Sequence, residues 1–197
     1  MKQLHLIYVP GLGDSRVGGQ SWAVARWQRQ RGVSSELCQM NWADGEAWPP
    51  KLERILGSID AAIARGQDVG LVAASAGGSA VINAYAARPN VVTGVVIIAG
   101  KVNRPESVGA KYKANNPAFW TAVRDCQAAL ASLTPELRRR IMSRHGIIDE
   151  MVLAADNRIP GAVNQLVPTI GHVVTIGTQL TLGARSFIGF LRSLQQP

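Results

Sequence analysis

The sequence predicts an α/β fold with a mainly parallel sheet and helices on both faces. Short apolar runs have the composition of buried strands, and segments with helical periodicity separate them along the chain. One run, Val91–Ala99, is rich in β-branched residues, which is typical of a parallel strand covered on both faces. The 197 residues are 47% hydrophobic and 17% charged, so we expect one globular domain spanning residues 1–197.

Residues that break regular structure bound the predicted strands. Leu4–Val9 is followed by Pro10 and Gly11, and Val69–Ala74 is followed by the small residues around Ser75. We interpret the first run as a strand rather than a signal peptide, because it is short and stops at a proline. The predicted strands are Leu4–Val9, Glu36–Met40, Val69–Ala74 and Val91–Ala99.

Helical periodicity is clearest from Leu52 to Ile63, where apolar residues recur at steps of three and four, and Gly66 is the expected C-terminal cap. Thr134 and Pro135 provide an N-cap and a first-turn proline for a short helix. The predicted helices are one that contains Trp22–Trp27 and ends near Gly32, and those over residues 52–63, 76–87, 135–140 and 182–194.

Basic residues outnumber acidic ones, 21 Lys and Arg against 13 Asp and Glu, which gives a formal net charge of +8. The excess raises the question of a nucleic-acid or anionic partner. The charges are scattered, and the densest run, Arg138–Arg140, has no alternating aromatic residues that could stack on bases. We therefore expect no nucleic-acid partner.

The chain has two cysteines, Cys38 and Cys126, far apart and without the spacing of a metal site or a disulfide framework. We expect no metal and no cofactor, and a reducing, cytoplasmic location. No apolar run reaches the roughly 18 residues of a membrane span. A membrane-spanning helix is therefore not expected.

Ser75 lies in the most informative motif, Val69-Gly-Leu-Val-Ala-Ala-Ser75-Ala-Gly-Gly-Ser79. An apolar strand, a serine and small residues leading into a helix place the hydroxyl on a tight strand-to-helix turn. The first N–H groups of the helix, chiefly that of Ala76, are aimed where an oxyanion would form. The alternative is a phosphate-binding turn, or a connection in which strand and helix merely pack closely. No Lys follows the glycines as in a Walker loop, and the order of serine and glycines does not fit a dinucleotide fingerprint.

These residues resemble the α/β-hydrolase superfamily, in particular its small serine esterases and lipases, and the resemblance covers nearly the whole chain. Ala73-Ala74-Ser75-Ala76-Gly77 stands for the G-x-S-x-G elbow, with Ala at the first position. Tyr8-Val9-Pro10-Gly11-Leu12-Gly13 resembles the loop after an early strand, which usually begins with His-Gly, with Pro10 in place of the His. The resemblance implies that the Leu12 and Ala76 N–H groups form an oxyanion hole.

The superfamily order of nucleophile, acid and base implies an acid that follows Ser75 in the chain. The segment Ile141–Val152 resembles the strand followed by G-x-x-D-x-x-V, which selects Asp149. Met142-Ser143-Arg144 is an unusual composition for a buried strand, so the match to this motif depends on Gly146, Asp149 and Val152 alone. Glu150 and Asp156 therefore remain alternative acids.

Three histidines are available for the base. His5 lies within the first predicted strand, and His145 directly precedes Gly146. His172 follows a short apolar run and Gly171, which resembles the final strand and catalytic loop of the superfamily before its last helix. The resemblance therefore selects His172, and Gly171 allows the backbone to bend toward Ser75.

The implied function is a serine hydrolase that cleaves an ester or related acyl bond of a small molecule through an acyl-enzyme intermediate. Ser75 is the expected nucleophile, His172 the base and Asp149 the residue that orients the imidazole. A thioesterase, an amidase or an acyltransferase on the same site is an alternative, as is a catalytically silent binding protein with this fold. The sequence implies no oligomeric state.

The segment from about Gly100 to Leu133 occupies the place of the superfamily's specificity-determining insertions. It is short, so we expect a lip of one or two helices, about residues 100–133, and an open cleft for small or chain-end acyl groups. Lys101 and Arg104 lie near a strand end and are candidate contacts for a substrate carboxylate or phosphate. Solvated loop charges are the alternative.

Overall fold

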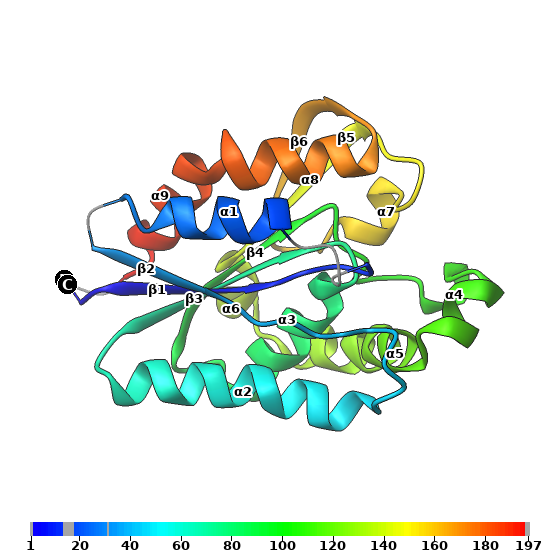
Figure 1. The fold of residues 1–197 in the computed structure, drawn as a ribbon, viewed down its shortest axis with the longest axis horizontal. Helices are drawn as coiled ribbons and strands as arrows, with labels where there is room; N and C mark the ends of the chain where they lie inside the picture. Colours follow the sequence, from blue (N-terminus) through cyan, green and yellow to red (C-terminus); the bar gives the residue numbers. More distant parts are fainter. Residues whose placement is uncertain (1, 14–17, 31, 196–197) are drawn as a thin grey trace.

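The computed structural model describes residues 2–13, 18–30 and 32–195, which form a six-stranded sheet with helices on both faces (Figure 1). All neighbouring strands pair in parallel, in the order β2-β1-β3-β4-β5-β6. The predicted α/β class with a parallel sheet is confirmed. The strands are β1 (Leu4–Val9), β2 (Val33–Leu37), β3 (Asp68–Ala74), β4 (Val92–Ile98), β5 (Ile141–Ile148) and β6 (Val163–Ile170).

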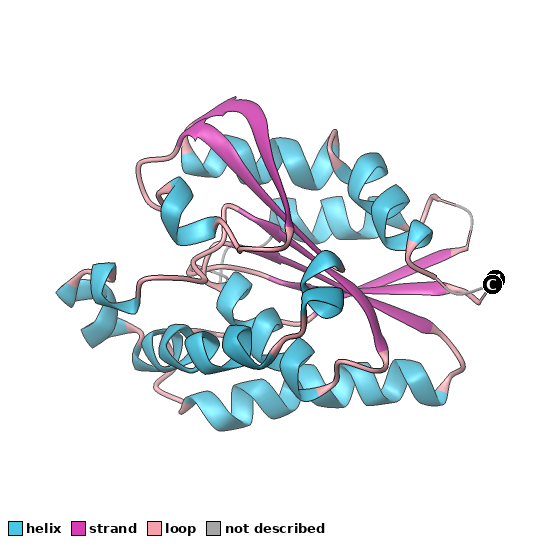
Figure 2. Ribbon diagram, turned by 180° about the vertical axis from the view of Figure 1, so that it is seen from behind, coloured by secondary structure: helices cyan, strands magenta, loops and turns pink. Residues whose placement is uncertain are grey.

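Two helical layers enclose the sheet, as the view from behind in Figure 2 also shows. One layer contains α2 (Trp48–Ala64), α3 (Gly77–Ala87) and α5 (Pro117–Ser132), and the other contains α1 (Gly18–Trp27), α8 (His172–Thr181) and α9 (Ala184–Ser193). The short helices are α4 (Ala110–Asn115), α6 (Pro135–Arg139), α7 (Ala154–Asn157) and the 3₁₀ turn η2 (Pro105–Ser107).

The central strands are covered on both faces, which explains their continuous apolar composition. Every residue of β4 is buried, and so is every residue of β3 after Asp68. Side chains that alternate along these strands enter two separate core clusters, one under each helical layer. The sheet therefore holds the whole fold together as its middle layer.

Helix α2 confirms the clearest helical prediction. Prolines occupy its first turn, where a missing N–H costs no hydrogen bond. Ile55 and Ile59 are fully buried on its inner face. Gly66, just past its end, has φ +73° and donates its N–H to the Ile63 carbonyl at 2.8 Å, as expected of a C-terminal cap.

Strand β2 lies at Val33–Leu37 and not at Glu36–Met40, so the sequence prediction was wrong by three residues. This strand is at the edge of the sheet, and four of its five residues are half-buried. An edge strand has a weak apolar signal, because one side of it faces solvent. Pairing with β1, in which Leu4 lies opposite Val33, determines its position.

The predicted terminal helix over 182–194 is confirmed as α9, but a further helix, α8, precedes it and was not predicted. Two helices, α8 and α9, follow β6, and the chain turns between them at Leu182 and Gly183. His172 is the first residue of α8 rather than part of a loop before the last helix. The apolar residues of α8 are too few and too exposed to give a clear helical stripe, with Val173 76% exposed.

Arg144 lies in strand β5 and is buried, which is unusual for an arginine in a strand. Its guanidinium donates hydrogen bonds to Gln165 at 2.9 Å, Gln179 at 2.9 Å, the Gly183 carbonyl at 3.1 Å and Ser186 at 2.7 Å. Burial lowers the pKa of Arg144. The strand accepts this side chain because partners from β6, α8 and α9 surround it.

The segment 100–133 contains η2, α4 and α5. Helix α5 packs into the layer beside α3 through buried residues that include Ala122, Val123 and Cys126. None of the helices within the described residues combines the length and the apolarity that crossing a bilayer requires.

Candidate functional site

Four loops that follow parallel strands converge at one edge of the sheet. Leu12 follows β1, Ser75 follows β3, Asp149 follows β5 and His172 follows β6. Because carboxyl ends of parallel strands lie at the same edge, residues far apart in sequence meet there. This edge contains the residues that the sequence singled out as nucleophile, acid and base.

Ser75 occupies a strained turn between β3 and α3. Its φ is +52°, a left-handed value that side chains other than glycine rarely adopt and that costs roughly 1–3 kcal/mol. The backbone is held there because the Ser75 N–H donates to the Ile98 carbonyl at 3.1 Å. Its carbonyl accepts from the Gly78 and Lys101 N–H groups at 3.0 Å each. The turn leaves the Ser75 hydroxyl half-buried at the edge of the sheet.

Small residues around the turn leave space for the neighbouring loop. A Cβ on Gly77 would lie 2.2 Å from the Val9 carbonyl oxygen. A Cβ on Gly11 would lie 2.6 Å from the Ser75 Cβ. Glycine at both positions therefore allows the loop after β1 to approach Ser75.

The side chains of Ser75, His172 and Asp149 form a continuous hydrogen-bonded chain. His172 Nε2 lies 3.0 Å from Ser75 Oγ, and His172 Nδ1 lies 2.8 Å from Asp149 Oδ2. The Asp149 side chain is 3% exposed and that of His172 is 6% exposed. This arrangement can take a proton from the hydroxyl and hold the imidazole in one orientation.

The Asp149 carboxylate is held by its own loop as well as by His172. Its Oδ1 accepts hydrogen bonds from the Met151 N–H at 2.9 Å and the Val152 N–H at 2.8 Å. Two backbone donors and the imidazole therefore satisfy a nearly buried carboxylate.

Glu150, one of the alternative acids, contacts the backbone of His172 and not its ring. The His172 N–H lies 3.0 Å from Glu150 Oε2 and 3.2 Å from Oε1. A carboxylate at the N-terminus of α8 satisfies a free N–H and interacts favourably with the helix dipole. Gly171, with φ +95°, allows the chain to turn into α8 at this point.

Asp156, the other alternative acid, pairs with Lys101. Lys101 Nζ lies 2.8 Å from Asp156 Oδ1, and the Lys101 ammonium also donates to the Ser107 hydroxyl. Both side chains of the ion pair are at most 7% exposed. Burial lowers the pKa of Lys101, against the opposing effect of the Asp156 carboxylate.

Lys101 and Arg104 lie in different places. Lys101 lines the same pocket as Ser75. Arg104 lines a neighbouring hollow beside Pro105 and Arg158, with its Nη1 3.7 Å from Asp156 Oδ1.

A pocket of about 110 Å³ opens beside Ser75. Lys101 and Asp156 give it a polar side. Its apolar wall consists of Leu12, Val108, Tyr112, Phe119, Met151 and Val152. Most of this wall could not be predicted from the sequence, because its residues come from three loops and two helices that only the folded chain brings together.

The Ala76 N–H directly follows Ser75 in the chain, and the Leu12 N–H belongs to a residue that lines the same pocket as Ser75. Ala76 is the N-cap residue of α3, so its N–H has no intrahelical acceptor. Leu12 lines the pocket with Ser75, and no described residue accepts a hydrogen bond from its N–H. Both groups are therefore available as donors. Across the described part of the chain, no cluster of His, Cys, Asp and Glu could hold a metal ion.

Comparisons with known proteins identify the fold. No family model matches the chain, and no match was found among curated proteins. Solved structures do match. One of the metagenome-derived lipolytic enzymes LipS and LipT superposes with a TM-score of 0.74 at 12% identity, covering 98% of this chain and 94% of that one. Est1E from Butyrivibrio proteoclasticus gives 0.69 at 16% identity, covering 98% and 88%.

A protein from Xanthomonas campestris pv. campestris, described as a hydrolase of the α/β superfamily, gives a TM-score of 0.63 at 20% identity. The alignment covers 96% of this chain and 98% of that one. The chain has the α/β-hydrolase fold.

Proposed function

We propose that this protein is a serine hydrolase that cleaves carboxylic esters through a Ser75-His172-Asp149 triad. The observation that carries the proposal is the hydrogen-bonded chain from Ser75 Oγ to His172 Nε2, 3.0 Å, and from His172 Nδ1 to Asp149 Oδ2, 2.8 Å. Fold alone does not imply activity, so the site geometry carries the argument. Esterases and lipases among the proteins of similar fold are consistent with it.

In the first half of the reaction, His172 Nε2 accepts the Ser75 proton while Oγ attacks the acyl carbon. Asp149 accepts the Nδ1 hydrogen bond and stabilises the imidazolium that forms. The protonated His172 then donates its proton to the leaving alkoxide, which departs as an alcohol and leaves an acyl-Ser75 ester. Water attacks this ester with His172 again as base, which releases the acid and restores Ser75.

The N–H groups of Leu12 and Ala76 are the proposed donors to the oxyanion of each tetrahedral intermediate. Both come from backbone that is already held in place, so no reorganisation is required as charge develops. The dipole of α3, which begins just after Ser75, adds to this stabilisation.

The proposed substrate is a small acyl ester, because the pocket of about 110 Å³ accommodates only a few non-hydrogen atoms. Lys101 is a candidate donor to a polar group of the substrate. Its charge is already paired with Asp156, so it favours a neutral hydrogen-bond acceptor over a carboxylate. Arg104 is proposed to act only on a substrate long enough to leave the pocket. A thioesterase, an amidase or an acyltransferase would use the same residues.

We further propose a reducing compartment, the cytoplasm, for this protein. Cys38 and Cys126 are both unpaired and buried. Burial raises the pKa of the Cys38 thiol to about 11, so it stays protonated and unreactive.

The test is labelling by a fluorophosphonate probe and turnover of p-nitrophenyl esters of increasing acyl length. We expect the protein to be labelled and Ser75→Ala to lose both labelling and turnover while its circular dichroism is unchanged. Ser132→Ala, which removes an exposed hydroxyl on α5, is the matched control and should retain both. Absence of labelling in the folded wild-type protein would contradict the proposal and favour a catalytically silent binding protein.

A further inference from the structure

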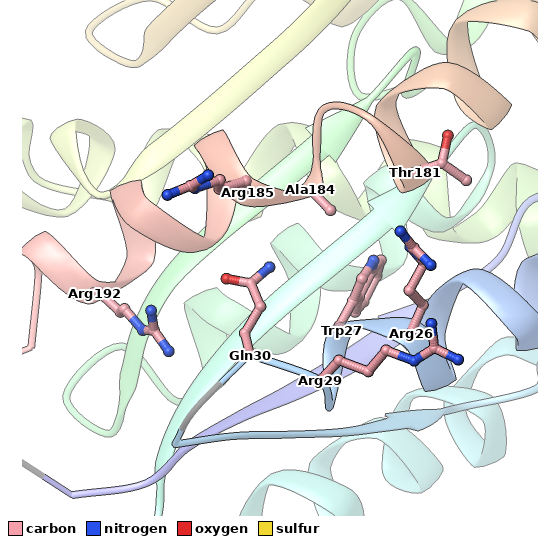
Figure 3. A pocket seen from close by; sticks show the side chains of 8 residues that line it. All are labelled: Arg26, Trp27, Arg29, Gln30, Thr181, Ala184, Arg185 and Arg192. Atoms are coloured by element: carbon pink, nitrogen blue, oxygen red, sulfur yellow. The ribbon is translucent and has the colours of Figure 1, made fainter.

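Another pocket, which we call the arginine pocket, lies in the helical layer of α1, α8 and α9 and has no part in the proposed reaction. Its volume is about 490 Å³. Figure 3 shows Arg26 of α1 and Arg29 of the following turn on one side of it, and Arg185 and Arg192 of α9 on the other. Trp27 and Ala184 lie between them, and both are buried.

The charge of this pocket is entirely of one sign. Residues 18–30 and 172–195 contain no Asp or Glu, and each of their four arginines lines the pocket. Within the described part of the chain, no carboxylate lies within 4.0 Å of the guanidinium of Arg26, Arg29 or Arg185. Arg185 and Arg192 are seven residues apart on α9, so they share a helix face, whereas Arg29 lies in the turn just after α1, two residues beyond its last residue, Trp27.

The N-terminus of α9 adds to the positive potential. Its first turn has no acidic residue, and Gly183 provides no side-chain cap. Arg185 is placed at the positive end of the helix dipole, where a cation is unfavourable. Arg144 lies beneath, donating to the Gly183 carbonyl at 3.1 Å and the Ser186 hydroxyl at 2.7 Å, and all of its hydrogen-bond partners are neutral.

Such an arrangement costs folding free energy, because like charges repel and the helix N-terminus is uncompensated. An anion with several oxygens would relieve both costs at once. Guanidinium groups donate paired hydrogen bonds to phosphate oxygens, and free N–H groups at a helix N-terminus donate hydrogen bonds to a bound anion.

We propose that this pocket binds a ligand with two or more phosphate groups. Guanidinium groups on opposite walls require an anion that spans them, which favours an oligophosphate over a single carboxylate. The pocket volume is large enough for an oligophosphate with an attached organic group. The source of the phosphates can be a soluble metabolite or a lipid headgroup.

The test is isothermal titration calorimetry with sodium tripolyphosphate at low ionic strength. Wild-type protein should bind, and affinity should fall as salt is added. The double variant Arg26→Gln/Arg185→Gln, which changes one exposed arginine on each wall, should weaken binding at least about 10-fold, because each substitution removes a charge-assisted hydrogen bond to a phosphate oxygen.

Arg124→Gln is the matched control, since it removes one charge from α5 on the opposite layer of the sheet. The affinity for tripolyphosphate should stay within about 2-fold of the wild-type value, because a substitution far from the pocket has little effect on binding there. Ser75→Ala should also bind normally, so the outcome does not depend on the proposed esterase activity.

A second arm identifies the source of the phosphates. Vesicles of phosphatidylcholine with a phosphoinositide should be bound, and released by tripolyphosphate, if the ligand is a headgroup. Binding of tripolyphosphate without vesicle binding identifies a soluble ligand. Binding of neither, or equal weakening by Arg124→Gln and the double variant, would overturn the proposal.

Discussion

Asp149, Glu150 and Asp156 are three carboxylates close together in the sequence, and each has a different partner. Asp149 contacts the ring of His172, Glu150 contacts its backbone, and Asp156 is paired with Lys101. Only the first contact can select an imidazole tautomer. The proposed roles therefore depend on which atom each carboxylate reaches and not on acidity alone.

Asp149→Asn is expected to lower kcat by about 10³- to 10⁴-fold, because the amide favours the wrong His172 tautomer and cannot stabilise its positive charge. Glu150→Gln is the control. Its amide oxygen can still accept the His172 N–H, so kcat should change by less than about 10-fold. Steady-state kinetics on a p-nitrophenyl ester measures both. A larger loss for Glu150→Gln than for Asp149→Asn would mean that the acid is wrongly assigned.

The pH dependence of activity tests the role of His172. As general base, its imidazole must be neutral, so kcat/KM should fall in acid solution, where the imidazole carries a proton. The profile should be measured with a substrate whose chemistry is rate-limiting. A profile that does not fall in acid, on protein that stays folded, would contradict a histidine base.

At the scale of elements, the β3-turn-α3 unit places the nucleophile, and it depends on close contact with the loop after β1. The turn stores backbone strain at Ser75. Buried packing of α3 offsets this strain, since its residues from Gly77 to Tyr85 are all buried. A change that separates α3 from β1 should therefore affect both stability and catalysis.

Gly77→Ala is expected to destabilise the protein by about 1–3 kcal/mol and to lower kcat, because its Cβ would overlap the Val9 carbonyl oxygen. Gly57→Ala is the matched substitution at an exposed position of α2, where no atom lies within 4 Å of the new Cβ. It should stabilise by about 0.5–1 kcal/mol through helix propensity. Urea denaturation midpoints distinguish the two; a midpoint for Gly77→Ala at or above the wild-type value would refute the close approach.

At the scale of the whole molecule, the proposed catalytic edge and the arginine pocket differ in charge. The proposed catalytic edge has a balanced ion pair, Lys101 with Asp156, whereas the arginine pocket has no carboxylate among its lining residues. Helix α8 joins the two, since His172 is its first residue and Thr181, its last, lines the arginine pocket. The net charge of +8 is thus distributed unevenly over the surface.

The stability of the whole chain should depend on pH through His145. Burial, and then the nearby Arg158 charge, lower the pKa of His145 below its ordinary 6.5. The unfolded chain therefore takes up this proton at a higher pH than the folded one. The contribution to stability is fully present above pH 6.5, and it is lost as pH falls from 6.5 through the folded pKa.

His145→Gln should reduce the loss of unfolding free energy between about pH 7 and pH 5, because the substituted residue takes up no proton in either state. Arg158→Gln should give an intermediate loss, since it removes only the smaller cause of the shift. Urea unfolding at both pH values measures the difference. An unchanged loss in His145→Gln would show that His145 does not control stability in this range.

The amino-acid sequence by itself determined the parallel α/β class, the buried central strands and the nomination of Ser75, Asp149 and His172. The class, the strands and Ser75 follow from local signals, namely apolar runs and small residues at a turn, whereas Asp149 and His172 were selected by the resemblance to the α/β-hydrolase superfamily. It also indicated α2 with its Gly66 cap correctly, because a long amphipathic stripe is a strong periodic signal.

Only the tertiary structure decided the position of β2 and the burial of Arg144. In both cases the determining partner is distant in sequence: β1 for the edge strand, and β6, α8 and α9 for the guanidinium. The pairing of Lys101 with Asp156 and the gathering of four arginines from α1, the turn after it and α9 have the same cause. Local composition determines which elements form, but contacts between elements distant in the chain determine which charges meet, and those contacts exist only in the folded protein.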